Sequence, residues 1–147
     1  MKTHLAIGVF AVLLLIEHVN YKIAFVFVAL AATILPDIDS GFSTIGKHKV
    51  FKIFQFFTQH RGVFHSFSMC LLISFLIALY FPIFAFPFFL GYSVHLFADS
   101  FTVEGIRFFW PFKARSAGLL KVGGVTEHAL FIGFCIVDLV MLFLFFV

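Results

Sequence analysis

The chain has 147 residues, of which 63% are hydrophobic, 20% aromatic and only 12% charged, with a formal net charge of +3. Together with a mean hydropathy of +1.13, this composition excludes an ordinary soluble domain and indicates a membrane protein. Four or five apolar segments take up most of the residues, so we predict one integral-membrane domain over residues 1–147.

The first two apolar runs predict two helices. Leu5 to Ile16 follows a basic start, and no small-x-small cleavage site comes after it, so we interpret it as a retained helix rather than a signal peptide. If it begins near Lys2, it has about seventeen residues and a length of roughly 25 Å, which spans a thin bilayer. The second run, Ile23 to Leu35, is closed by Pro36, because proline disfavours the helical conformation at the residue before it.

Two polar loops and three more helices follow. Within the loop Ser40 to Gln59, the segment Val50 to Phe57 is expected to lie as a short amphipathic piece on the membrane surface. The low-charge run Val63 to Ala98 is too long for one span and predicts a helical hairpin that turns near Phe81-Pro82. The remaining elements are a polar loop, Ser100 to Thr126, and a last helix, Ala129 to Val147, introduced by Glu127-His128. The sequence therefore predicts an all-α, polytopic membrane bundle of about five helices with two cytoplasmic loops.

Five spans place the strongest candidate side chains on one face of the membrane. These are His4, Asp37, Asp39, His60, His65, His95, Asp99 and Glu127. The same face carries nine of the ten Lys and Arg residues, Lys22 being the exception. The positive-inside rule makes this face cytoplasmic. The basic residues either report this topology alone or also attract an anionic lipid head group or phosphate.

The spacing of the histidines and carboxylates favours one shared metal site. His95 and Asp99 are four residues apart on a helix, so they project from one face and can bind the same cation. His60 and His65 do not share a face on a regular helix, but Gly62 allows His60 to lie in the turn before the helix starts.

Two further groups come from the N-terminal part of the chain. His4 lies in the first turn of the first helix, and Gly8 one turn later permits close helix approach. Asp37 and Asp39 are two apart in a turn, a spacing at which one can ligate a metal while the other orients a histidine or bridges.

We therefore predict a metal site, because each of these side chains is expensive to bury in lipid without a partner. The predicted ligands are His4, Asp37, His60, His65, His95 and Asp99. Mixed imidazole and carboxylate ligands suit zinc, manganese or iron. Thiolate ligation is excluded, because Cys70 and Cys135 lie in apolar runs without CxxC spacing.

Four other polar residues have predicted roles near this site. Glu127 completes it as a ligand or general base, whereas Asp138, three helical turns further on, is expected to be a buried structural carboxyl. Arg61 either stabilises charge on a phosphoryl group or only sets the topology. Ser66 is expected to cap a helix or to support His65, not to act as a nucleophile.

Four ordered motifs resemble a known family, the small bacterial and archaeal inner-membrane proteins classed as metal-dependent hydrolases, some of them under LexA control. The matching elements are Thr3-His4, Leu35-Pro36-Asp37-Ile38-Asp39, His60-Arg61-Gly62-Val63-Phe64-His65-Ser66 and Gly91-Tyr92-Ser93-Val94-His95-Leu96-Phe97-Ala98-Asp99, with a further fit from Gly105 to Phe112. That family is distantly similar to the zinc-dependent phospholipase C and single-strand nuclease group. The resemblance implies metal ligation by His4, Asp37, His60, His95 and Asp99. The chain has one His-x-x-x-Asp pair where those enzymes usually have a second ligand pair, so one or two metal ions are expected rather than three.

The predicted function is hydrolysis of a phosphoester bond in a membrane lipid at the cytoplasmic face of the inner membrane. One or two divalent ions, zinc by preference, would activate a water molecule, with Asp39 or Glu127 accepting its proton and Arg61 stabilising the phosphoryl oxygens. No nucleic-acid partner is expected. Two alternatives use the same residues: a small metal-ion transporter, and a structural membrane protein whose loops are held by a metal. The far face offers the transporter only Glu17 and His18 as further ligands.

Overall fold

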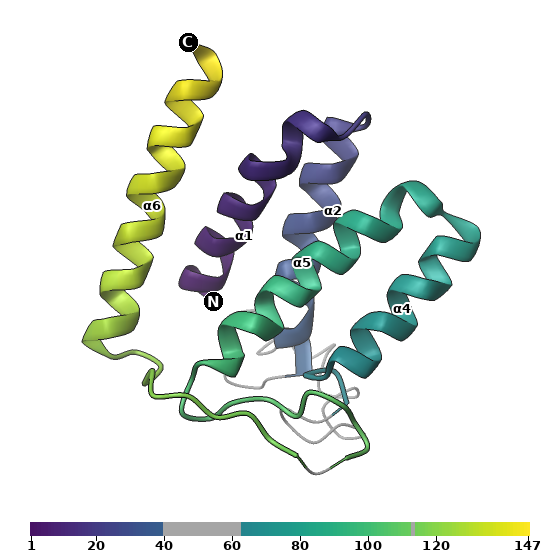
Figure 1. Ribbon diagram of the computed structural model, residues 1–147, viewed down its shortest axis with the longest axis vertical. Helices are drawn as coiled ribbons and strands as arrows, with labels where there is room; N and C mark the ends of the chain where they lie inside the picture. The colour runs from purple at the N-terminus through teal and green to yellow at the C-terminus, as the bar shows by residue number, and fades with distance from the viewer. Residues whose placement is uncertain (40–62, 113) are drawn as a thin grey trace.

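The computed structural model describes residues 1–39, 63–112 and 114–147, and within these ranges the protein is all-helical, as predicted (Figure 1). The α-helices are α1 (Lys2–Leu15), α2 (Lys22–Ile34), α4 (Phe67–Tyr80), α5 (Pro82–Ser100) and α6 (Val125–Phe146). Two 3-10 helices, η1 (Ile16–His18) and η2 (Leu35–Asp39), continue α1 and α2. Five helices and no strand in the described ranges confirm the predicted fold class. The predicted amphipathic segment Val50 to Phe57 lies outside the described residues.

The helix boundaries follow the sequence signals closely. The hairpin turns where it was predicted, with α4 ending at Tyr80 and α5 starting at Pro82, where the proline needs no helical hydrogen bond. The second helix departs from the prediction, because Pro36 ends the α-helix without ending the helical path, which tightens into η2 through Asp39. This turn carries Asp37 beyond the end of α2 and toward α5.

Two helices are long and apolar enough to cross a membrane, α5 over Pro82–Ser100 and α6 over Val125–Phe145. The other three have 14, 13 and 14 residues. Each is therefore about 20 Å long, shorter than the roughly 30 Å of a hydrocarbon core. The five predicted spans thus correspond to two helices of full length and three shorter ones.

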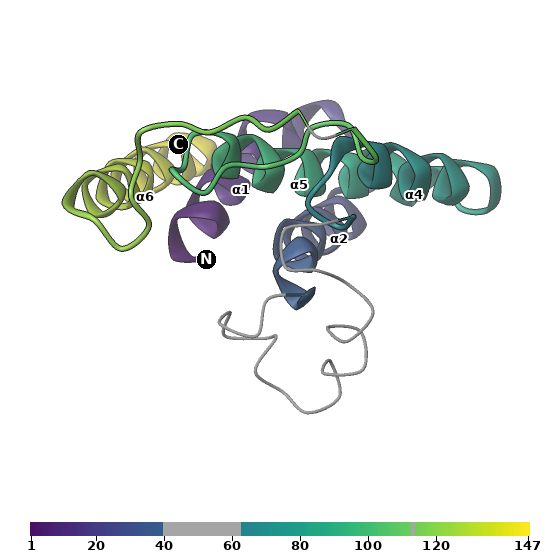
Figure 2. The same ribbon diagram turned by 90° about the horizontal axis from the view of Figure 1, so that it is seen from below.

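The helices form a row with one helix packed across it. Viewed from below, α4, α5, α1 and α6 lie side by side, and α2 covers one face of the row (Figure 2). The start of α1, the end of η2, the starts of α4 and α6 and the end of α5 all lie toward the lower end in Figure 1. The C-terminus lies at the upper end. This is the arrangement of helix ends that the sequence predicted.

Small residues bring α1, α2 and α5 into close contact. A Cβ atom added at Gly91 would lie 2.0 Å from the carbonyl oxygen of Ala29, so α5 rests directly on the backbone of α2. A Cβ at Gly8 would lie 2.9 Å from Thr33 Oγ1, which confirms the predicted close approach of α1. Ala29 and Thr33 are each 1% exposed. These contacts fix the distances between the three helices that carry His4, Asp37 and His95.

Candidate metal centre

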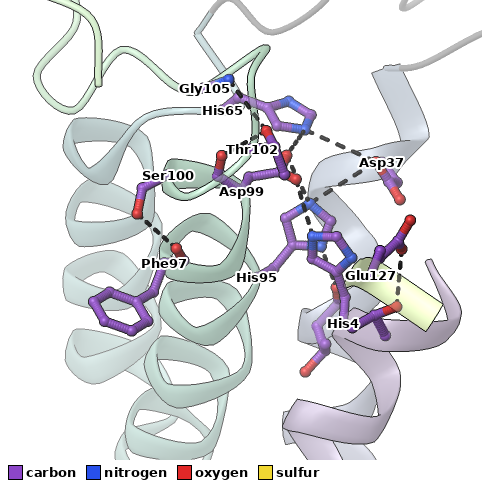
Figure 3. Close-up of polar contacts among 12 residues, drawn as sticks. His4, Asp37, His65, His95, Phe97, Asp99, Ser100, Thr102, Gly105 and Glu127 are labelled. Carbon is purple, nitrogen blue, oxygen red and sulfur yellow. Dashed lines mark hydrogen bonds and ion pairs between the residues drawn. The ribbon is translucent and has the colours of Figure 1, made fainter. Parts of the chain in front are cut away.

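At the end of the bundle that lies lower in Figure 1, four side chains form a closed ring of alternating nitrogen and oxygen atoms (Figure 3). His65 Nε2 lies 3.9 Å from Asp37 Oδ1 and 3.6 Å from Asp99 Oδ2. His95 Nε2 lies 3.8 Å from Asp37 Oδ1 and 3.7 Å from Asp99 Oδ2. None of these separations is a hydrogen bond, which ends near 3.2 Å for nitrogen and oxygen. The ring therefore encloses a gap lined by four potential metal ligands.

The packing of α5 on α2 fixes the orientation of His95. Its Nδ1 lies 2.7 Å from the carbonyl oxygen of Thr33. A carbonyl can only accept, so Nδ1 carries the hydrogen and Nε2 of the neutral ring presents its lone pair to the gap. Nε2 is buried and has no hydrogen-bond partner among the described residues. This is the arrangement that a metal-ligating histidine requires.

A hydrogen-bonded turn before α4 presents His65. Tyr92, fully buried in α5, donates from its hydroxyl to the carbonyl oxygen of Phe64 at 2.6 Å. Ser66 donates to the carbonyl oxygen of Val63 at 2.6 Å and accepts from the N–H of Met69 at 3.3 Å. Ser66 is thus the N-cap of α4, which confirms the predicted capping role. Both contacts hold the turn so that His65 points into the ring.

His4 adds a third imidazole to the cluster. Its Nε2 lies 2.9 Å from Asp99 Oδ1, the oxygen that does not face the ring, and its ring centroid lies 4.5 Å from that of His95. Candidate ligand atoms of His4, His95 and Asp99 lie within 4.8 Å of one another, as do those of Asp37, His65 and His95. The cluster thus offers two overlapping sets of three ligands, with His95 common to both.

Glu127 joins α6 to the start of α1 beside His4. Its Oε1 accepts a hydrogen bond from Thr3 Oγ1 at 2.8 Å, and its Oε2 accepts one from the N–H of Gly123 at 2.6 Å. The first contact joins α6 to α1, and the second holds the turn that precedes α6. The predicted roles of Glu127 as ligand or base stay predictions.

Hydrogen bonds join the second polar loop to the end of α5 and to the start of α4. Thr102 donates to the carbonyl oxygen of Asp99 and accepts from the N–H of Gly105. The N–H of Phe67 donates to the carbonyl oxygen of Phe108 at 2.9 Å, which ties the loop to the start of α4. These bonds hold the ends of α4 and α5, and with them His65 and Asp99, in a fixed relation.

The ring fits a divalent ion in chemistry and in size. Adjacent ligands of a tetrahedral zinc ion with bonds of about 2.0–2.1 Å lie roughly 3.3–3.4 Å apart. The four separations of 3.6–3.9 Å are a few tenths of an ångström wider. The four atoms would have to approach one another by only these few tenths to reach the spacing of zinc ligands. Burial also fits, since the side chains of His65, His95 and Asp99 are at most 3% exposed.

The structure brings together five of the six predicted ligands: His4, Asp37, His65, His95 and Asp99. His60, the sixth, and Arg61 lie outside the described residues, as does the side chain of Asp39. Asp138 is half-buried, and its Oδ1 has no hydrogen-bond partner in the described part of the chain. Cys70 and Cys135 are free.

Sequence reasoning missed two supporting residues. Thr33 acts through its backbone carbonyl, which no side-chain pattern reports. Tyr92 stands three residues before His95 and therefore on the same helical face, a spacing that could have indicated its position.

The fold and the cluster define a class: a small all-helical membrane protein that gathers buried histidines and carboxylates at one end of its bundle. The family model described as YdjM inner membrane protein matches residues 1–147, so the chain belongs to the YdjM inner membrane protein family. Membership confirms the predicted inner-membrane location, while the relation to hydrolases and phospholipases C stays a prediction. No curated protein and no solved structure matches the chain significantly.

Proposed function

We propose that the protein is a metal-dependent hydrolase that cleaves a phosphoester bond of a lipid at the cytoplasmic face of the inner membrane. The observation that carries the proposal is the ring of His65, Asp37, His95 and Asp99, with separations of 3.6–3.9 Å. Such ligands would hold zinc, manganese or iron. When bound, such an ion supplies Lewis acidity that activates water and polarises a phosphoryl group.

The chain's own residues orient the site and control access to it. The Thr33 carbonyl holds His95, and His4 holds Asp99 through the oxygen that faces away from the ring. Asp37 is the most accessible member, with its side chain 18% exposed against at most 3% for the others. The ring is therefore least enclosed beside Asp37. The predicted base Asp39 follows two residues later in the sequence.

We propose that the chain crosses the membrane several times, on the basis of the lengths of its helices and the positions of its basic residues. With their 3-10 extensions, the first two helical paths reach about 27 Å and 30 Å. Arg107, Arg115 and Lys121 lie in the described loop at the end that carries the ring, which favours a cytoplasmic location for that end. The same charges suit a substrate that bears a phosphate.

Elemental analysis of protein purified in detergent tests the proposal. Wild type is compared with His95→Ala and His65→Ala, and with His18→Ala, which removes an exposed imidazole at the other end of α1. Turnover of a phosphodiester lipid and a phosphomonoester lipid is followed on the same samples. We expect one or two metal ions per chain and turnover in wild type and His18→Ala, and loss of both in the two ring variants.

Each other outcome counts against a defined part of the proposal. Bound metal without turnover of either lipid would refute the hydrolase and favour the transporter or the structural role. A folded wild type that contains no metal and takes up none on incubation with zinc, manganese or iron would refute the metal site itself.

A further inference from the structure

A cavity beside the metal centre suggests how a lipid is held. It has a volume of about 320 Å³ and lies between the start of α1, the end of α5, the loop residues 120–122 and the first half of α6. Its walls are almost entirely apolar and include Ile7, Phe97, Phe101, Leu130 and Phe134. Cavities that bind small ligands start at about this size. The cavity is therefore large enough for part of a lipid chain.

The polar end of the cavity meets the metal centre. His4 lines the cavity and is also hydrogen-bonded to Asp99 of the ring. The other nitrogen of its ring, Nδ1, is buried without a hydrogen-bond partner among the described residues. Lys121 lines the cavity as well and is exposed. The carboxylate of Glu127 also lines the cavity, but its two oxygens already accept hydrogen bonds from Thr3 and Gly123. An unused imidazole nitrogen and an ammonium group at the mouth of an apolar cavity complement an anionic head group joined to an apolar chain.

The packing of α6 leaves the cavity accessible from the side. No described residue of α6 is buried, and among the helices α6 packs chiefly on α1 (Figure 1). Phe97 in the last turn of α5 and Phe101, the residue after α5, are 58% and 48% exposed although they line the cavity. In an inner-membrane protein, aromatic side chains exposed at a helix end lie where the lipid head groups meet the hydrocarbon. A lipid chain can then enter between α5 and α6 without passing through water.

We propose that this cavity binds one acyl chain of a phospholipid and thereby places its phosphoester beside His4. The inference rests on the proposed hydrolase function for the identity of the bond, but chain binding itself is testable without turnover. The occupant is a phospholipid rather than a free fatty acid, because the proposed reaction needs a phosphoester near the ring, which the cavity adjoins through His4.

Photo-crosslinking in vesicles tests the proposal. The protein is reconstituted into vesicles of phosphatidylethanolamine and phosphatidylglycerol that contain a phospholipid with a diazirine on one acyl chain, and crosslinked peptides are mapped by mass spectrometry. Leu130→Trp fills the cavity. Ile132→Trp is the matched control, because its isomeric side chain stands two residues away, is 52% exposed and does not line the cavity.

We expect crosslinks concentrated on the cavity side chains of α1, α5 and α6 in wild type and in Ile132→Trp. In Leu130→Trp they should fall about tenfold, the effect of excluding roughly two methylene groups from an apolar site. Crosslinks spread evenly around α6, or equal in both tryptophan variants, would overturn the proposal. Equal labelling by a free fatty acid with the same diazirine would overturn the assignment to a phospholipid.

Metal content measured on the same samples separates the two proposals. Cavity labelling without any metal in wild type would refute the hydrolase and leave the lipid site standing. Metal and turnover without cavity labelling would refute only the lipid site.

Discussion

We predict that the close contact of Gly91 with α2 is needed to hold His95 in its position at the site. In Gly91→Ala the new methyl would lie 2.0 Å from the carbonyl oxygen of Ala29. Backbone atoms cannot rotate away, so the two helices must separate by about 1.4 Å to restore van der Waals contact. Overpacking of this kind costs about 1–3 kcal/mol of unfolding free energy. It also disrupts the bond from His95 Nδ1 to the Thr33 carbonyl, which is only 2.7 Å long in the native packing.

Two other glycines provide graded controls for the same substitution. A methyl at Gly8 would lie 2.9 Å from Thr33 Oγ1 and 3.1 Å from its Cγ2, which are side-chain rather than backbone atoms, and one at Gly133 in α6 would meet nothing within 4 Å. We expect thermal unfolding in detergent to rank the variants, with Gly133→Ala at least as stable as wild type, Gly8→Ala slightly destabilised and Gly91→Ala most destabilised. Metal content should fall only in Gly91→Ala. If Gly91→Ala unfolds at the same temperature as Gly133→Ala and retains its metal, the helix contact does not position His95.

Three further predictions address separate parts of the site. Tyr92→Phe removes the 2.6 Å bond to Phe64 and should weaken metal binding about tenfold in a chelator competition, because His65 is less well oriented; an unchanged affinity would contradict this. Thr3→Val removes the bond to Glu127 and should lower the unfolding free energy by about 1 kcal/mol and speed hydrogen exchange at the start of α6. The exposed Thr126→Val is its control, and the idea fails if both variants behave alike. Metal removal by a chelator should lower the unfolding temperature of wild type by the equivalent of about 3 kcal/mol when the metal was present at 100 times its Kd. His95→Ala should be insensitive to the chelator.

The sequence predicted the fold because its strongest signals are local. Pro82 marks the hairpin turn, and the apolar runs on either side are long enough to define the helices. Pro36 was a weaker guide to where the second helix ends. The α-helix stops before it, but the chain continues as the 3-10 helix η2, so Asp37 lies further beyond α2 than predicted. We predicted five spans from the number of apolar runs. The helices α1, α2 and α4 are shorter than a full membrane crossing.

The sequence was enough to predict which residues form the candidate site, but not which of their atoms contact one another. Charged and imidazole groups are rare in a chain this apolar, so topology alone placed His4, His95 and Asp99 at one end. Topology cannot tell which atom of a residue faces which neighbour. The two oxygens of Asp99 point to different partners, one to His4 and one to the ring, and the sequence holds no signal for that division.

The contact between Thr3 and Glu127 joins residues separated by 124 positions, and that between His4 and Asp99 joins residues separated by 95. Because a chain is made from its N-terminal side, Thr3 and His4 are made well before the partners that they contact. His4 therefore has no Asp99 beside it until α5 packs against α1. The complete cluster therefore forms only when α5 has packed against α1 and α2, so it reports that these helices have assembled.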